Sequence, residues 1–112
     1  MIEITDRNFN TEVLEAAQPV LVVFVASWCG PSKSFKPHIE HHVKSTQYQG
    51  IKSCIIDIDQ SPNAVETSDV RSTPTSVIFN KGKIKGAIMG GQSSNLKLID
   101  NAVDRVLWEN RE

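Results

Sequence analysis

The sequence predicts an α/β fold in which helices cover both faces of a mixed β-sheet. One observation is a continuous, mostly β-branched apolar run over residues 20–25, the pattern of a central strand buried on both faces. A second is the alternation of strand-like and helix-like segments, which is typical of parallel strands joined by helical crossovers. The third is the turn-forming stretch at residues 80–83, which reverses the chain and makes the last two strands antiparallel.

The first half of the chain predicts two strands and two helices. Residues 2–4 alternate between apolar and polar, as in a short strand exposed on one side. Apolar residues then recur at helical spacing over residues 7–17, with Asp6 as the predicted N-cap. After the turn that contains Cys29, apolar residues four apart predict one long helix that continues to about residue 47, with a kink at Pro37.

The second half of the chain predicts three more strands and two more helices. The predicted strands cover residues 51–58, 76–79 and 84–89. A short helix is expected at residues 63–68, after a turn-like segment that ends in proline. A last amphipathic helix is expected to begin at Ser93 or Ser94, because either side chain can cap it.

Length and composition are those of one globular domain, and we expect residues 1–112 to form a single domain. The chain has 112 residues, of which 39% are hydrophobic and 22% charged, enough to bury a core without disulfides or metals. Its formal net charge is −1, and its cations are dispersed among acids, so no nucleic-acid partner is expected. No run approaches the roughly 20 apolar residues of a membrane span, so no membrane partner is expected.

The cysteine count and the first residues bear on the cellular compartment. Only Cys29 and Cys54 are present, too few for a disulfide scaffold or a four-ligand zinc site. The first residues lack the basic start and apolar core of a signal peptide. We therefore expect a cytoplasmic protein whose cysteines act individually.

The turn after the central strand reads Trp28-Cys29-Gly30-Pro31-Ser32-Lys33. A thiolate is the nucleophile in disulfide exchange, and a free cysteine with a pKa near ~8.5 is only slightly ionised at neutral pH. At a helix N-terminus, unpaired backbone amides and the helix dipole favour the anion, and Lys33 adds positive field. We therefore predict a reactive Cys29. Cys54 lies in an isoleucine-rich strand and is predicted to be buried and inert.

Further residues along the chain complete a recognisable pattern. They are Phe24, Ala26, Pro37, Asp57-Ile58-Asp59, Pro62, Val70-Arg71, Thr73-Pro74-Thr75, Phe79, Gly82 and Gly90. Together with the Trp-Cys-Gly-Pro turn, they show that the chain resembles the thioredoxin family over essentially its whole length. The resemblance implies the thioredoxin fold, with a mixed sheet in the strand order 3-1-2-4-5 and a cis peptide bond before Pro74. It also implies thiol-disulfide exchange, with Cys29 as the attacking nucleophile.

The resemblance also implies a substrate-docking surface around the thiol. In thioredoxins the residue before the cis proline, here Thr73, pairs its backbone with that of the substrate. The remaining substrate-binding positions carried over from the family are Trp28, Gly30, Pro31, Pro74, Met89 and Gly90. The implied partners are disulfide-containing substrate proteins and a thioredoxin reductase or other thiol donor. No cofactor or metal is implied, and a monomer is expected.

Three positions depart from the family pattern. Ser32 stands where the family has its second, resolving cysteine, and a hydroxyl is no adequate nucleophile toward sulfur. We therefore expect the chain to capture substrates as mixed disulfides without releasing them. Thioredoxins commonly carry a buried aspartate and a lysine that handle protons for the release step. Val23 and Ile55 take those positions here, an apolar pair that leaves no stranded charge.

The residues are compatible with three functions. The one we favour is a protein disulfide reductase whose position 32 has been changed to serine, by engineering, so that it traps mixed disulfides. The second is a natural monothiol protein that completes exchange with glutathione or another external thiol. The third is a redox-silent adaptor that binds a partner noncovalently, although the retained Cys29 argues against it.

Several other polar and aromatic residues are interpreted as structural. His38, His41 and His42 lie at helical spacing, and we interpret them as a solvated helix face, not as a metal site. Trp108 is interpreted as packing alone. Asp57 and Asp59 are interpreted as solvated acids at the end of a strand.

Overall fold

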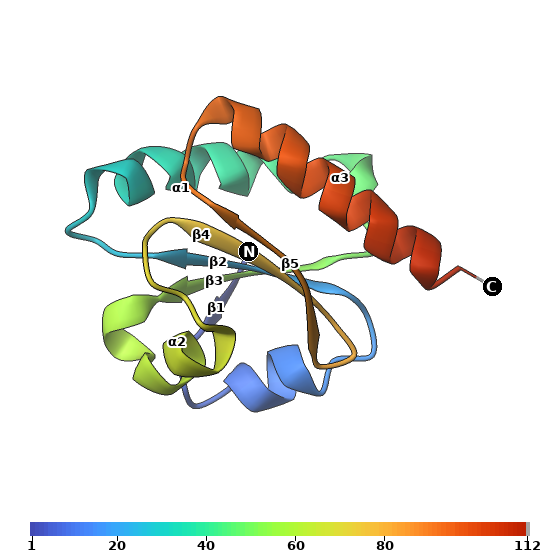
Figure 1. The fold of residues 1–112 in the computed structure, drawn as a ribbon, viewed down its shortest axis with the longest axis horizontal. Helices are drawn as coiled ribbons and strands as arrows, with labels where there is room; N and C mark the ends of the chain where they lie inside the picture. The colour runs from blue at the N-terminus through green and yellow to red at the C-terminus, as the bar shows by residue number, and fades with distance from the viewer. Residues whose placement is uncertain (112) are drawn as a thin grey trace.

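The computed structural model describes residues 1–111 as a five-stranded mixed sheet between two layers of helices. The strands are β1 (Ile2–Ile4), β2 (Val20–Val25), β3 (Lys52–Asp57), β4 (Thr75–Asn80) and β5 (Lys83–Met89). The helices are α1 (Gly30–His42), α2 (Pro62–Ser68) and α3 (Ser93–Glu109), with short helical turns η1 (Asn10–Leu14), η2 (Thr46–Tyr48) and η3 (Ile58–Gln60). Helices α1 and α3 cover one face of the sheet, and η1 and α2 cover the other (Figure 1).

The predicted fold class is confirmed, but the predicted order of the first three strands is wrong. The order is β1-β3-β2-β4-β5, with β3 parallel to both β1 and β2. The middle of β3, residues 54–56, is buried, so its backbone N–H and C=O groups need a hydrogen-bonding strand on each side. Strand β1 has three residues, of which only Ile4 is buried, so it suits the edge of the sheet.

Strand β2 lies at the centre of the molecule and divides the core in two. Val20, Val22 and Phe24 pack toward η1 and α2, whereas Leu21 and Val23 pack toward α1 and α3. All five are at most 1% exposed, which explains why this strand reads as a continuous apolar run. Because β2 is held on both faces and both edges, the loop that follows it leaves from a fixed point.

Two predicted helices are shorter than expected. The first, predicted over residues 7–17, is the π-helical turn η1, in which the Glu15 N–H bonds to the Asn10 carbonyl at 2.9 Å. The second ends at His42, not at residue 47, because residues 44–46 are all polar and exposed. The chain then re-enters the core through Tyr48 in the separate turn η2.

Asp6 caps a different helix from the predicted one. Its carboxylate accepts the Asn63 and Ala64 backbone N–H groups at 3.1 and 2.9 Å, so it caps α2, 57 residues further along the chain. The first turn is held instead by Asn8, whose side-chain oxygen accepts the Thr5 N–H at 2.8 Å. An N-cap from a distant loop leaves no local sequence signal.

Removal of this cap tests the assignment. We expect Asp6→Ala to lower the free energy of unfolding by about 1 kcal/mol, because two N–H groups at the start of α2 lose their acceptor. Urea denaturation measures the change. Glu66→Ala, an exposed change within the same helix, serves as the control and should stay within about 0.5 kcal/mol of the parent. Equal losses for both variants would contradict the capping role.

Candidate functional site

The thiol of Cys29 sits at the junction of β2 and α1. Cys29 is the N-cap residue of α1, with an extended backbone (φ −97°, ψ 117°), and its carbonyl accepts the first helical hydrogen bond from the Lys33 N–H at 3.0 Å. Pro31 occupies the first turn, where its missing N–H costs nothing. The sulfur is partly exposed and forms no disulfide. The Cys29 thiol therefore lies at the N-terminal end of the helix dipole, as the sequence predicts.

The surroundings of Cys29 favour its thiolate. As drawn, the sulfur donates to the Thr73 carbonyl oxygen at 3.4 Å, a contact that only the protonated thiol can make. After ionisation the sulfur is an acceptor, and donors face it from Thr73 and Ser32. The Thr73 hydroxyl, followed by the Ser32 backbone N–H and the Ser32 hydroxyl, lowers the pKa of Cys29 below its ordinary value. The lowered pKa agrees in direction with the prediction made from the position of Cys29 at a helix N-terminus.

Ser32 lies beneath the thiol in the first turn of α1. It is 1% exposed, and its hydroxyl makes no hydrogen bond in the described structure. The hydroxyl hydrogen is therefore available to the Cys29 thiolate, which is one of the causes of the lowered pKa. As an alcohol, Ser32 stabilises the nucleophile but cannot form a disulfide with it.

The loop before β4 meets the thiol from the opposite side. The Thr73-Pro74 peptide bond is cis, as the resemblance implies. Pro74 itself is buried, and its carbonyl accepts the Gly90 N–H at 2.8 Å. The structure thus brings Thr73 beside Cys29, 44 residues away in sequence, and Gly90 against Pro74.

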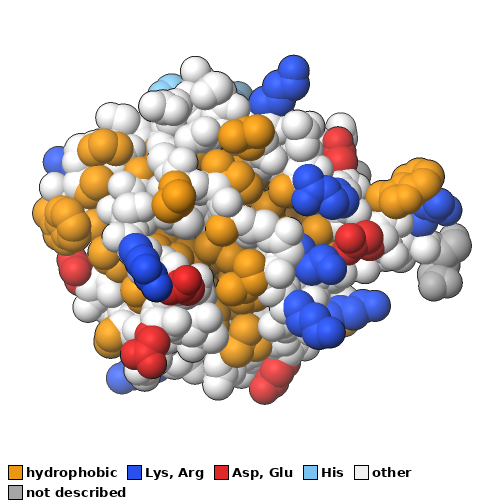
Figure 2. All heavy atoms as spheres, in the orientation of Figure 1, with side chains coloured by type: hydrophobic (Ala, Val, Ile, Leu, Met, Phe, Trp, Pro, Cys, Tyr) orange, Lys and Arg blue, Asp and Glu red, His pale blue; other side chains and the backbone are white. Residues whose placement is uncertain are grey.

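Exposed apolar side chains lie around this junction. Trp28 and Met89 are 69% and 72% exposed, and Gly30 and Pro31 are exposed beside them. Figure 2 shows hydrophobic side chains gathered at the end where the loop from β2 to α1 lies and across the middle of this face. Most Lys and Arg side chains in this view collect at the opposite end. Such an apolar patch next to a reactive group is typical of a docking surface.

Three residues that the sequence reasoning missed support this surface. Asp59 accepts the Trp28 indole N–H at 2.8 Å, so it orients the exposed ring and is not merely a solvated acid. The buried Asn95 side chain donates to the Met89 carbonyl at 3.1 Å and holds the end of β5. Gly91 packs so tightly that a Cβ there would lie 3.0 Å from atoms of both Phe35 and Pro74. Of the three, only Asp59, which lies in η3, was among the residues of the family pattern.

Val23 and Ile55, which take the positions of the family's aspartate and lysine, lie opposite each other in the sheet. Val23 and Ile55 are register partners on β2 and β3, and they are 0% and 7% exposed. An aspartate and a lysine at these positions would form a buried pair, whereas valine and isoleucine fill the space without any charge to satisfy. No proton carrier therefore stands at this pair.

Comparisons with known proteins agree with this arrangement. The chain matches the family model Thioredoxin over residues 1–103. It is 38% identical over 105 residues to a thioredoxin of Chlorobaculum thiosulfatiphilum, which covers 90% of this chain and 94% of that one. The chain belongs to the thioredoxin family. A thioredoxin of Rickettsia felis is 39% identical over 92 residues, with coverage of 82% and 87%.

The fold of another thioredoxin is also similar. The solved structure of Malassezia sympodialis thioredoxin aligns with a TM-score of 0.81 over 90% of this chain and 89% of that one, at 22% sequence identity. Family membership makes the chain a thiol-disulfide oxidoreductase, and thioredoxins act on protein disulfides with electrons from a thioredoxin reductase. Residues 1–111 contain no helix long and apolar enough to cross a membrane.

The second cysteine of this thioredoxin is buried in the core. Cys54 is 0% exposed in β3, and burial raises its pKa to about 11. Its neighbours in this half of the core include Val22 and Ile56. The predicted burial of Cys54 is therefore confirmed, and Cys29 is the cysteine whose sulfur is partly exposed.

One histidine and one tryptophan differ from their predicted roles. His42 is only partly exposed: its ring lies 2.7 Å from the Asp100 carboxylate, which also accepts the Tyr48 hydroxyl at 2.5 Å. Burial, followed by the Asp100 hydrogen bond, raises the pKa of Tyr48. Trp108 is 66% exposed, with Arg111 stacked 3.5 Å over its ring, so it is not a packing residue. Within residues 1–111, no three His, Cys, Asp or Glu side chains gather as a metal site would require.

The pH dependence of alkylation tests the environment of the thiol. We expect the rate at which iodoacetamide modifies Cys29 to reach its plateau at a lower pH than in the unfolded chain, because the lowered pKa keeps the thiolate populated there. Cys54 should stay unmodified while the protein is folded, since it is buried and its pKa is raised. Ser32→Ala should move the Cys29 midpoint upward by removing one donor. A plateau that coincides with that of the unfolded chain would contradict this environment.

Proposed function

We propose that Cys29 attacks the disulfides of substrate proteins and that the resulting mixed disulfide persists until an external thiol attacks it. The observation that carries this proposal is the buried hydroxyl of Ser32 in place of a second sulfur, directly beneath a partly exposed thiol with a lowered pKa. Attack requires only a thiolate and access, both of which the site provides. Internal release requires a second thiolate, which the site does not provide.

The attack step is a disulfide exchange. The Cys29 thiolate forms a bond to one substrate sulfur, the substrate disulfide breaks, and its second sulfur leaves as a thiolate that takes up a proton. The backbone of Thr73, beside the cis proline, is the proposed partner for an extended substrate segment. Trp28 and Met89, both highly exposed, are the proposed apolar contacts.

Thr73, Pro31 and Gly90 complete the proposed docking surface on the exposed side of the sulfur. Pro74, although carried over as a docking residue, is buried and supports this surface from below. We place the protein in a reducing compartment such as the cytoplasm, because free low-molecular-weight thiols are abundant there. We also propose that it acts as a monomer.

The Val23–Ile55 pair favours a monothiol protein over a single trapping substitution at position 32. A change of one residue would leave the aspartate and lysine of an ordinary thioredoxin in place. Here both positions are apolar, register-paired and packed into the core. A chain without an internal release step has no use for the proton-handling pair, so the loss of that pair agrees with the loss of the resolving sulfur.

A single-turnover experiment tests the proposed function. The reduced protein is mixed with insulin, and Cys29 adducts are followed by mass spectrometry before and after glutathione is added. We expect one insulin adduct per chain, stable without added thiol and released by glutathione. Cys54→Ser should behave like the parent, and Cys29→Ser should form no adduct. If the parent forms no adduct, the chain is a noncovalent adaptor and the proposal fails.

A further inference from the structure

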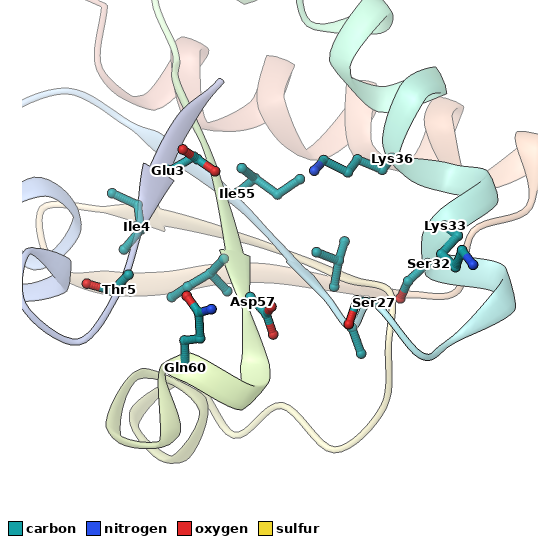
Figure 3. A pocket seen from close by; sticks show the side chains of 13 residues that line it. Glu3, Ile4, Thr5, Ser27, Ser32, Lys33, Lys36, Ile55, Asp57 and Gln60 are labelled. Atoms are coloured by element: carbon teal, nitrogen blue, oxygen red, sulfur yellow. The ribbon is translucent and has the colours of Figure 1, made fainter.

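A cavity of about 450 Å³ lies beside the first turns of α1, on the β1 side of the sheet. The end of β2 and the strands β1 and β3 form its other walls, and Figure 3 shows the side chains that line it. Its apolar floor includes Ile4, Ile55 and Ile56. None of the proposed docking residues for protein substrates contributes to it. The cavity is therefore separate from the substrate surface and large enough for a small molecule.

Charged side chains of both signs line this cavity. Glu3 and Asp57 line it on the sheet side, and Lys33 and Lys36 line it on the helix side. Within residues 1–111, neither lysine forms an ion pair, and neither does Glu3. In Figure 3 the Lys36 side chain extends across the cavity toward Ile55 and Glu3. A ligand with one carboxylate and one ammonium group would complement these two walls.

Ser32 connects the cavity to the thiol. The residue lines the cavity (Figure 3), although it is 1% exposed and its buried hydroxyl has no hydrogen-bond partner in the described structure. The same hydroxyl contributes to the lowered pKa of Cys29, so it lies next to the sulfur. Ser32 is therefore the residue that stands between the cavity and Cys29.

Disulfide exchange sets the direction of attack. The attacking, central and leaving sulfurs lie roughly in line, so a thiol that attacks Cys29 must come from the side opposite the substrate sulfur. The substrate is expected on the exposed side, near Trp28 and Met89. The opposite side is Ser32, and beyond it the cavity. Entry through the cavity is therefore compatible with a bound substrate.

We infer that this cavity docks the external thiol that releases the substrate, and that its preferred ligand is a small thiol carrying both a carboxylate and an ammonium group. This inference rests on the proposed function, because only a chain without an internal resolving thiol needs an external one. Lys36 binds the carboxylate, and Glu3 binds the ammonium. The ligand thiolate then attacks the sulfur of Cys29 past the Ser32 hydroxyl.

The release sequence balances with two ligand thiols. The first thiolate forms a bond to Cys29 and expels the substrate sulfur as a thiolate, which takes up a proton. The second attacks the ligand sulfur of the new mixed disulfide and frees the Cys29 thiolate. One substrate disulfide is reduced, and two ligand thiols are oxidised to one ligand disulfide.

The test uses the mixed disulfide that Ellman's reagent forms with Cys29, so it does not depend on capture of any protein substrate. Glutathione and the uncharged 2-mercaptoethanol are compared for release of coloured thionitrobenzoate, with rates expressed per thiolate. We expect the glutathione rate to saturate with concentration and the 2-mercaptoethanol rate to rise linearly. Mass spectrometry should show glutathione on Cys29 as the first product.

Variants that neutralise the exposed charged residues of the cavity test whether glutathione binds there. Lys36→Gln and Glu3→Gln should each lower the second-order rate constant for glutathione by about fivefold and leave that for 2-mercaptoethanol unchanged. Lys44→Gln, which removes an exposed lysine beyond the end of α1, is the matched control and should change neither. A glutathione rate that never saturates, or that ignores both variants, would overturn the docking site and leave the proposed function intact.

A nonreactive analogue locates binding without any chemistry. S-methylglutathione should shift the backbone amide NMR signals of residues 3–5, 33–36 and 55–57 in the reduced protein. These segments surround the cavity. Shifts confined to Thr73 and Met89 would place the ligand on the substrate surface and overturn the inference. Failure of insulin capture, by contrast, would overturn the proposed function.

Discussion

Ser32→Cys is expected to accelerate release of a captured substrate by at least about 100-fold over release by a millimolar external thiol. The new sulfur would stand beneath Cys29 at the N-terminus of α1, and well-oriented intramolecular groups reach effective molarities of about 10⁵ M or more. Part of this advantage is lost because Val23 and Ile55 carry no proton. Insulin reduction in single turnover, followed by the lifetime of the Cys29 adduct, measures the effect.

A second cysteine on the same helix gives the control for that experiment. Ser34 is exposed, so Ser34→Cys adds a thiol of similar sequence position that does not lie under Cys29. Its adduct should persist as in the parent. Adding Val23→Asp to Ser32→Cys should speed release further if proton transfer limits it. An adduct of Ser32→Cys as long-lived as that of the parent would show that the position is not competent for resolution.

Phe35→Ala is expected to cost about 3–5 kcal/mol of unfolding free energy, the usual range for emptying a buried phenylalanine site. Phe35 is 1% exposed on α1 and packs in the same half of the core as Val23 and Ile99. It also lies against Gly91, next to Pro31 and Pro74. The variant should therefore loosen the docking surface as well as the core, and urea denaturation together with the insulin capture rate measures both effects.

Two neighbouring variants separate packing from helix propensity in this experiment. Phe35→Leu keeps most of the buried volume and should cost clearly less than Phe35→Ala. Lys36→Ala, at the next and exposed position of α1, should stay within about 0.5 kcal/mol of the parent. If Phe35→Ala costs no more than Lys36→Ala, the packing described here is wrong.

Elements with a strong local signal were predicted closely. The structure places β2 at residues 20–25, as predicted, because its apolar run is buried on both faces whichever strands become its neighbours. The β4–β5 turn also follows from sequence: Lys81 and Gly82 both adopt positive φ, at 54° and 81°, and glycine accepts this conformation without strain. The placement of Cys29 at a helix N-terminus follows from the strand-turn-helix pattern around it.

Elements defined by distant contacts were predicted less well. Asp6 precedes an apolar helical pattern and looked like its cap, but the N–H groups it binds come from α2. His42 lay on a polar stretch and looked solvated, but Asp100 and Tyr48 approach it from α3 and η2. The residues next to Asp6 and His42 in the sequence give no indication of these partners, which lie far away along the chain.

The sequence by itself predicted the chemistry that we propose: a reactive Cys29, a Ser32 that cannot resolve its mixed disulfides, and a buried Cys54. These depend on residue types and local spacing, which a sequence states directly. Only the tertiary structure decided that β3 separates β1 from β2 and that Asp59 orients Trp28. Only it shows that Ser32 is among the residues lining a cavity that also has charged side chains of both signs. Each of these depends on which surfaces meet when the sheet closes between its helices.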